Sequence, residues 1–239
     1  MIKYEKYSVV HDNEDADNWQ RRADRFSLYF EHNISQWLPV DRDARILEIG
    51  SGRGYLLNYL RQQGYVLAHG IDACPESIET ARQRDLNCEC ADAFQYLCRT
   101  DKGKWDCIIS IEVIEHFTKE DALILTKLIY TKLRPEGRLI FKTDNGYNLM
   151  AYSALCYDIT HEYLFSQQSM KQLFVWSGFN LANIEIKGSF SWVFWKNPLN
   201  YIGLSVETAL NLFTKLLHRL YGRNTTTIFT KSILAKAVR

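Results

Sequence analysis

The chain lacks an excess of charge of either sign. Of its 239 residues, 29 are Lys or Arg and 28 are Asp or Glu, so the formal net charge is +1. Proteins that bind DNA or RNA through the phosphate backbone usually carry a clear basic excess on one surface. The composition therefore gives no support to a nucleic-acid partner, and we expect none.

The sequence also lacks the patterns of a zinc site, an export signal or a membrane span. Its six cysteines form no C-x-x-C pair, so we expect no structural zinc site. Residues 1–12 are polar and contain no apolar signal core. No run approaches the ~20 apolar residues that a spanning helix needs. We therefore expect a cytoplasmic protein with reduced thiols.

No internal repeat and no low-complexity linker divides the chain. A content of 46% hydrophobic and 24% charged residues is ordinary for a globular domain that buries a real core. We expect one domain over residues 1–239. Within it, residues 1–40 form an N-terminal helical cover, with a helix over 19–38, and residues 190–225 form an insertion.

The most informative stretch is R-I-L-E-I-G-S-G-R-G-Y-L-L at residues 45–57. A short apolar run ends in three alternate glycines, Gly50, Gly52 and Gly54, and a helix-like segment follows. This order brings backbone N–H groups against a nucleotide-like ligand. The G-x-G-x-x-G spacing of dinucleotide sites is absent. Glu48, two residues before the first glycine, would repel a pyrophosphate but suits a ligand with an ammonium group.

Apolar runs alternate with helical patterns, which predicts parallel βαβ units and right-handed crossovers. Helices are expected over residues 56–63, 76–84, 94–99, 119–133 and 169–177. Strands are expected at 46–49, 66–71, 87–91, 105–111, 138–143, 179–187 and 228–238. Acidic residues follow three of these strands, and ligands of such sheets bind at the carboxyl ends of the strands.

The sequence E-I-G-S-G-R-G, with Asp72 and Asp92 after the next two strands, resembles the motifs of class I S-adenosylmethionine-dependent methyltransferases. The resemblance covers residues 45–117 and continues more loosely to the C-terminus. It implies a doubly wound α/β fold, Rossmann-like, with a seven-stranded, mostly parallel sheet whose last strand is antiparallel. It also implies S-adenosylmethionine as cofactor. The residues expected to bind it are Glu48, Gly50, Ser51, Gly52, Gly54, Asp72, Ala73, Asp92, Ala93 and Ile111.

The segment E-V-I-E-H-F at residues 112–117 follows the fourth strand at the same edge. Methylation of a hydroxyl needs positioning and removal of a proton, for which histidine is suited near neutral pH. We expect catalytic roles for His116, Glu115 and His161. The alternative is a histidine that only lines the pocket.

The same segment resembles small-molecule O-methyltransferases of the quinone-pathway type. It also resembles RNA 3′-end 2′-O-methyltransferases, in which two glutamates and two histidines hold a divalent ion. By that resemblance, Mg²⁺, Mn²⁺ or Zn²⁺ would bind Glu112, Glu115, His116 and His161, and a metal would lower the pKa of a bound hydroxyl.

Residues 158–179 resemble a pattern of bacterial methyltransferases that act in surface-polysaccharide and lipopolysaccharide assembly. This resemblance implies a sugar hydroxyl of a glycan or glycolipid as the acceptor. A quinone-like or other small-molecule hydroxyl is the alternative. A non-catalytic nucleotide-binding or interaction module is a further alternative, against which the complete set of glycines and acids argues.

The insertion at 190–225 opens with the aromatic cluster F-S-W-V-F-W and continues with an apolar stripe at helical spacing. Basic residues gather at its far end, between Lys215 and Arg223. Such a helix packs on its own domain as a lid, on a second copy in a homodimer, or in a membrane interface. The last alternative predicts peripheral contact with the inner face of the membrane.

Overall fold

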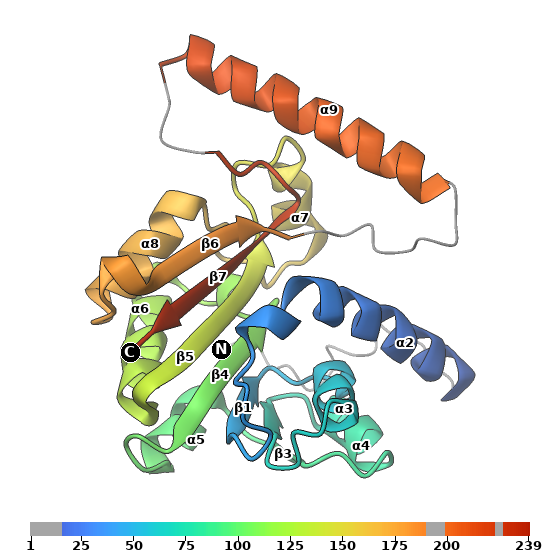
Figure 1. The fold of residues 1–239 in the computed structure, drawn as a ribbon, viewed down its shortest axis with the longest axis vertical. Helices are drawn as coiled ribbons and strands as arrows, with labels where there is room; N and C mark the ends of the chain where they lie inside the picture. The colour runs from blue at the N-terminus through green and yellow to red at the C-terminus, as the bar shows by residue number, and fades with distance from the viewer. Residues whose placement is uncertain (1–15, 190–198, 223–226) are drawn as a thin grey trace.

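A seven-stranded sheet lies at the centre of the protein, in the order β3-β2-β1-β4-β5-β7-β6 (Figure 1). The computed structural model describes residues 16–189, 199–222 and 227–239. All strand pairs are parallel except those of β7, which is antiparallel to β5 and β6. The strands are β1 (Ile46–Ile49), β2 (His69–Asp72), β3 (Cys88–Cys90), β4 (Trp105–Ile111), β5 (Leu133–Asp144), β6 (Ile184–Gly188) and β7 (Ser232–Val238). The expected fold class is confirmed.

Helices cover both faces of this sheet, and for this reason every residue of β1 is buried. Along β1, Ile46 joins the apolar cluster beneath α2, α3 and α4, whereas Leu47 joins the cluster beneath α5, α6 and α8. The helices are α2 (Ala16–Asn33), α3 (Tyr55–Gln62), α4 (Pro75–Arg82), α5 (Ala93–Arg99), α6 (Lys119–Lys132), α7 (Ala151–Tyr157), α8 (Gln167–Trp176) and α9 (Leu199–Leu220), with short 3-10 turns η2 (Ser35–Trp37), η3 (Ile114–His116) and η4 (Leu181–Asn183).

Several element boundaries differ from the sequence expectations. Val66 and Leu67 belong to an exposed turn, and β2 begins only at His69. The β6 strand begins at Ile184 because η4 occupies the preceding residues. Residues 134–137, which lie between the expected helix and the expected strand, belong to β5. They form an irregularity in this strand, since its pairing with β4 shifts there. These differences concern where the strands begin, away from the site. The carboxyl edge of the sheet lies in the expected place.

The N-terminal helix α2 packs against α3 and the glycine turn. It ends at Asn33, and η2 completes the segment that was expected as one helix over 19–38. The indole N–H of Trp19 donates a hydrogen bond to the carbonyl oxygen of Arg53 at 3.1 Å, and the indole stacks on Tyr55 with ring centroids 5.5 Å apart. The helix therefore supports the turn from the side away from β2.

The three glycines of the turn between β1 and α3 all have positive φ, at +75°, +49° and +83°. A Cβ added to Gly50 would lie 2.2 Å from Val113 Cγ2, and one added to Gly54 would lie 2.4 Å from Leu86 Cδ1. A Cβ at Gly52 would meet no atom within 4 Å. Gly50 and Gly54 are thus required by packing, whereas Gly52 faces open space.

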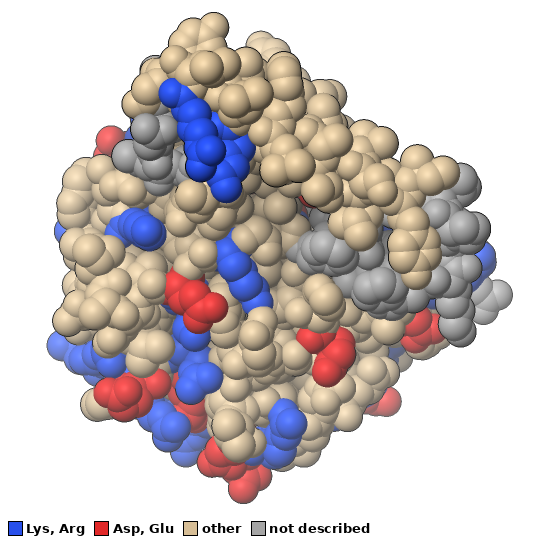
Figure 2. Space-filling view, turned by 45° about the horizontal axis from the view of Figure 1, so that its top comes forward, with Lys and Arg blue, Asp and Glu red and all other residues tan. Residues whose placement is uncertain are grey.

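Helix α9 lies apart from the helices that cover the two faces of the sheet, beyond its carboxyl edge (Figure 1). Figure 2 brings this side forward and shows a mainly uncharged upper part with a group of basic side chains, whereas side chains of both charges are spread over the middle and lower parts. The aromatic cluster expected at 190–195 lies outside the described residues. No described helix combines the length and apolar character that crossing a bilayer requires. The expectation of one domain stays a prediction.

Gly54→Ala should lower the free energy of unfolding by about 2–4 kcal/mol, because a strained φ adds to a steric clash with Leu86. Gly52→Ala should lower it by only about 1–2 kcal/mol, since only the left-handed conformation is penalised. Urea unfolding of the two variants measures the difference. Equal losses would contradict the assignment of Gly54 to packing and Gly52 to open space.

Candidate active site

The candidate site lies where β1, β2 and β4 end. The glycine turn follows β1, Asp72 ends β2, and η3 follows β4. The backbone N–H groups of Gly50 and Ser51 both donate to the carbonyl oxygen of Ile71, at 2.8 and 2.9 Å, so the turn is held against β2. Asp72 lies close enough for its charge to act on Glu48, and His116 lies close enough to act on Asp72. The three segments are therefore neighbours at this edge.

Glu48 lies in β1, just before the glycine turn, and has 4% of its surface exposed. The backbone N–H of Leu57, in the first turn of α3, donates to its carboxylate. The Oε2 atom accepts no hydrogen bond from the described residues. Burial first, and then the charge of Asp72, raise the pKa of Glu48 well above the usual carboxyl range. A cationic ligand beside Oε2 would favour the ionised form.

Asp72 is oriented by the backbone on both sides. Its Oδ2 accepts from the N–H of Gly52 and its Oδ1 from the N–H of Cys74, each at 2.8 Å. A carboxylate has about four lone-pair positions, so acceptor capacity remains for ligand hydroxyls. Burial raises the pKa of Asp72, and the two backbone hydrogen bonds oppose that rise.

Asp92 has a structural role in the ligand-free protein. Its Oδ1 accepts from the N–H of Gln95 at 3.0 Å and so caps the N-terminus of α5. Its contact with an adenine stays a prediction. The other expected cofactor residues lie in the same edge: Gly50, Ser51 and Gly54 in the turn, Ala73 after β2, Ala93 at the start of α5, and Ile111 at the end of β4.

This edge fits the cofactor that the sequence motif implies. Glu48 offers an unsatisfied, buried carboxylate oxygen to a cation, and S-adenosylmethionine carries an ammonium and a sulfonium group. Gly52 leaves open space where any other side chain would project. Asp72 offers acceptors for two hydroxyl groups. The assignment of individual contacts to these residues stays a prediction.

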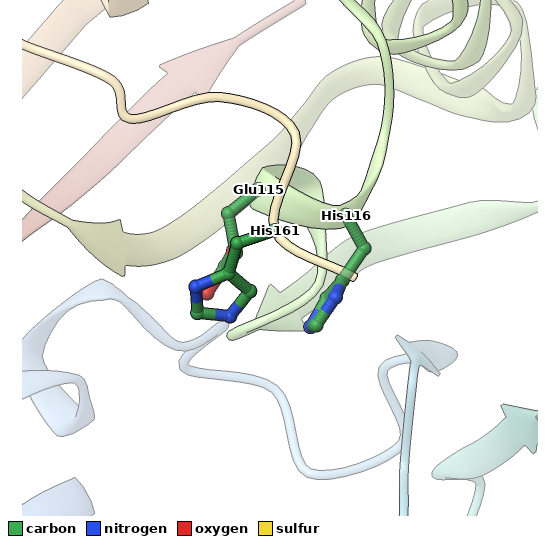
Figure 3. A group of neighbouring side chains, drawn as sticks. All are labelled: Glu115, His116 and His161. Carbon is green, nitrogen blue, oxygen red and sulfur yellow. The ribbon is translucent and has the colours of Figure 1, made fainter. Parts of the chain in front are cut away.

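A second group of side chains projects from η3 and from the loop between α7 and α8 (Figure 3). One donor atom from each of Glu115, His116 and His161 lies within 4.8 Å of the others. The two imidazole rings have centroids 4.7 Å apart and are inclined by 65°. The structure therefore brings together three of the residues that were expected to be catalytic or metal-binding.

Glu115 is fully buried and connects the parts of this group. Its Oε2 accepts from the hydroxyl of Thr143 at 3.0 Å, whereas its Oε1 has no partner among the described residues. Its backbone carbonyl accepts the N–H groups of Glu162 and Tyr163, at 2.8 and 3.2 Å. The loop that carries His161 is thereby fastened to η3. Burial raises the pKa of Glu115.

The hydrogen bonds of His116 determine its tautomer. The hydroxyl of Thr160 donates its single proton to Asp158 Oδ1 at 2.7 Å. The same oxygen lies 2.7 Å from His116 Nδ1, so Nδ1 must carry the proton and donate it. In the neutral ring, the lone pair is then carried by Nε2. Nε2 can therefore accept a proton or bind a metal.

His161 has the same tautomer for a simpler reason. Its Nδ1 lies 2.9 Å from the backbone carbonyl of Ala154, which only accepts hydrogen bonds. Its Nε2 therefore also presents a lone pair. The backbone N–H of His161 donates to the carbonyl oxygen of Asp158 at 3.1 Å, whereas the carboxylate of Asp158 accepts from Thr160.

Burial lowers the pKa of His116 below its usual value, with His161 adding to that effect and Glu115 and Asp158 opposing it. His116 is thus neutral near neutral pH. Asp158 and Thr160 were not recognised as functional residues in the sequence. The signal was the D-x-T spacing directly before His161, which is typical of a turn closed by an acidic side chain.

Glu112 does not join the group, which corrects the expected set of four metal ligands. It forms an ion pair with Lys142 of β5, and its backbone N–H donates to the carbonyl of Lys142 at 2.9 Å. Lys142 pairs with Ile111 across the sheet, so its side chain lies within reach of the next residue. Burial lowers the pKa of Lys142 to about 8.

The family model described as "Methyltransferase domain" matches residues 19–184. The chain is 25% identical over 142 residues to the ubiquinone biosynthesis O-methyltransferase of Neisseria meningitidis serogroup C, covering 54% of this chain and 58% of that protein. It is 27% identical over 106 residues to the phosphoethanolamine N-methyltransferase of Plasmodium falciparum, covering 43% and 40%. The matches thus span between 40% and 58% of the length of these curated relatives.

Solved structures share the fold at low identity. A SAM-dependent methyltransferase from Archaeoglobus fulgidus matches with a TM-score of 0.66 at 18% identity, over 91% of this chain and 94% of that one. Phosphoethanolamine N-methyltransferase 2 of Haemonchus contortus, solved with S-adenosyl-L-methionine, matches with a TM-score of 0.62 at 14% identity, over 100% of this chain and 60% of that one.

Glu48→Gln should stabilise the ligand-free protein near neutral pH, because the neutral amide avoids burying a charge. The folded protein holds the Glu48 proton to higher pH than the unfolded chain, so the wild type loses stability as pH rises from the usual carboxyl pKa through the raised one. The variant should lack that loss. Thermal unfolding across pH measures this effect, with Glu120→Gln at an exposed position as control.

The same variant should bind S-adenosylmethionine roughly 10- to 100-fold more weakly, because interactions of a charged acceptor contribute about 1.5–3 kcal/mol. Titration calorimetry measures the affinity. Unchanged affinity in Glu48→Gln would remove Glu48 from the cofactor site.

Proposed function

We propose, given that this chain belongs to the methyltransferase domain family, that it transfers a methyl group from S-adenosylmethionine to a hydroxyl group of its acceptor. One observation carries the proposal. The hydrogen bonds from His116 to Thr160 and from Thr160 to Asp158 select the tautomer in which Nε2 of the neutral imidazole carries the basic lone pair, close to Asp72.

S-adenosylmethionine, when bound, supplies a methyl group activated by the sulfonium charge. The residues of the chain hold the acceptor and remove its proton. Nε2 of His116 takes the proton of the acceptor hydroxyl, and the imidazolium that forms is stabilised by the charges of Glu115 and Asp158. Thr160 keeps the ring oriented during this transfer, because its oxygen accepts from Nδ1 before and after it.

A phenolic hydroxyl of a quinone-like molecule is our first candidate for the acceptor. A phenol has a pKa of about 10, whereas an alkyl hydroxyl resembles water at about 15.7. A histidine whose pKa is lowered by burial matches the more acidic hydroxyl. The similarity to ubiquinone biosynthesis O-methyltransferases supports the same choice. An amine acceptor, as the name of the phosphoethanolamine relative indicates, is the outcome to test against.

A sugar hydroxyl of a glycan or glycolipid is the second candidate, as residues 158–179 predict. The observation that favours it is the convergence of one possible ligand atom each from Glu115, His116 and His161. One carboxylate and two imidazoles leave open positions on a divalent ion. Such an ion would lower the pKa of a bound hydroxyl, which a weakly acidic sugar requires. Glu112 is not part of this set.

His116→Ala should reduce kcat by a factor of roughly 10²–10⁴ while the affinity for S-adenosylmethionine changes little, because only proton removal is lost. The rate of the wild type should rise with pH through a pKa below the usual value of histidine. Asp158→Asn should move this ascending limb to still lower pH, since Asp158 holds the pKa of His116 up. A limb that does not move would exclude His116 as the titrating base.

Chelation separates the two acceptor candidates. With a phenolic acceptor and His116 as a simple base, activity should survive EDTA treatment, and His161→Ala should reduce kcat by less than about tenfold. Loss of activity with EDTA, and recovery with Mg²⁺, Mn²⁺ or Zn²⁺ in the wild type but not in His161→Ala, would replace this mechanism with the metal-assisted one.

A further inference from the structure

Helix α9 directs its apolar side away from the protein. We call the outward face the five residues that recur on that side of the helix and are between 52% and 74% exposed: Ile202, Val206, Phe213, Leu216 and Leu220. The opposite side meets the body of the protein. Thr214 is buried there, and the ring of His218 contacts Tyr147 and Phe229, with centroids 5.1 and 4.9 Å apart.

This orientation is the reverse of the usual one. A surface helix normally turns its apolar stripe toward the core and its polar side toward water. In α9 the half-buried Glu207 and Asn211 lie on the inward side with Thr214. Contiguous apolar surface of this kind on a soluble domain marks an interaction site. The helix is therefore built to place its apolar side against something other than its own domain.

The neighbouring α7 and the loop after it also expose apolar side chains. Met150, Tyr152 and Tyr157 are each more than half exposed, and Ile159 is 95% exposed. The contact of Tyr147, just before α7, with His218 on the inward side of α9 places the two elements next to each other. Ile159 directly precedes Thr160 and is two residues from His161. An exposed apolar residue thus lies in the loop that carries the candidate catalytic residues.

Charge beside the outward face is basic. Arg219 lies about 100° from the centre of the outward face, at its border, whereas Lys215 and Glu207 lie about 140° from that centre on opposite sides of the helix, at ~100° per residue. Both of these side chains are half-buried, and Glu207 is the single acid between residues 199 and 222. Tyr201 and Tyr221 stand exposed at the two ends of the helix, where rings with a polar tip suit a membrane–water interface. Figure 2 shows basic side chains beside this uncharged surface.

We infer that the outward face of α9, extended by α7 and Ile159, docks on an anionic lipid surface with the helix lying parallel to it. An apolar side with basic residues at its border is the pattern of helices that lie in the interface. Together with the exposed Leu210 and Leu212 at its two borders, the outward face spans about 160° of the helix at ~100° per residue, wider than the seam of a two-helix coiled coil. A second copy packed in parallel would bring Arg219 near its own equivalent, whereas anionic head groups neutralise it.

Docking in this way would hold the mouth of the site at the lipid surface. Helix α9 lies beyond the carboxyl edge of the sheet (Figure 1), so the site faces the same side. Resting on the proposed function, the inference specifies the acceptor further as an amphiphile whose apolar part stays in the lipid layer while its hydroxyl reaches His116.

Co-sedimentation of the full-length protein with vesicles tests the docking. Vesicles of equal parts phosphatidylcholine and phosphatidylglycerol should pellet the protein, pure phosphatidylcholine should pellet much less, and high salt should release it. Lys215→Gln and Arg219→Gln should each weaken binding about fivefold. The double variant Phe213→Asp, Leu216→Asp should weaken it more than about tenfold.

The matched controls are Val40→Asp, an apolar residue 94% exposed before β1, and Lys102→Gln in the exposed loop before β4. Neither should change vesicle binding. Circular dichroism and S-adenosylmethionine calorimetry should be unchanged in every variant, because the altered side chains point away from the fold and the cofactor edge.

Wild-type protein that stays in the supernatant with anionic vesicles would overturn the inference, as would equal pelleting of the Phe213→Asp, Leu216→Asp variant. A dimer in sedimentation velocity that this variant dissociates, without vesicle binding by the wild type, would assign the outward face to a second copy instead. Intact calorimetry with absent vesicle binding would reject the docking alone, whereas absent S-adenosylmethionine binding would reject the proposed function.

Discussion

The arrangement of the site depends on the backbone carbonyl of Glu115. It accepts two N–H groups, from Glu162 and Tyr163, and so joins η3 to the loop before α8. The bridge from Asn145 to Phe165 holds the same loop, so His161 lies beside His116 although it comes 45 residues later in the chain. The hydrogen-bonded turn of Asp158 and Thr160 belongs to this loop, so the contact that sets the tautomer of His116 depends on its placement.

Two carboxylate oxygens remain unsatisfied at this edge, Glu48 Oε2 and Glu115 Oε1. A buried acceptor without a partner costs about 1–3 kcal/mol, and natural proteins retain such groups mainly where function needs them. The rest of the fold offsets this cost with a sheet covered on both faces, where strands such as β1 contribute apolar residues to two separate clusters. The stability of the core thus compensates for the two buried acceptors of the site.

The parts of the fold that follow from local pattern could be predicted from the sequence. The glycine turn, Glu48 of β1, Asp72 of β2, and the order of strands and helices depend on periodicity and on turn residues. Glu112 could not be assigned correctly, because its partner Lys142 lies on a neighbouring strand and is brought near only by the register of the sheet. Val66 and Leu67 looked like strand residues but lie in an exposed turn. For α9, spacing identified the helix, whereas the direction of its apolar side depends on tertiary contacts of Thr214 and His218.

Helix α2 is coupled to the glycine turn through the contacts of Trp19. The indole of Trp19 bonds the carbonyl of Arg53, stacks on Tyr55 and lies under the guanidinium of Arg84 at 4.3 Å. Order in the turn and docking of α2 therefore favour each other, and linkage makes that preference reciprocal. A ligand that immobilises the turn would protect α2 amides from hydrogen exchange, and any event that pulls α2 away would raise the entropy that the ligand must remove. Docking of the N-terminal helix and ligand binding at the glycine turn are in this sense linked equilibria.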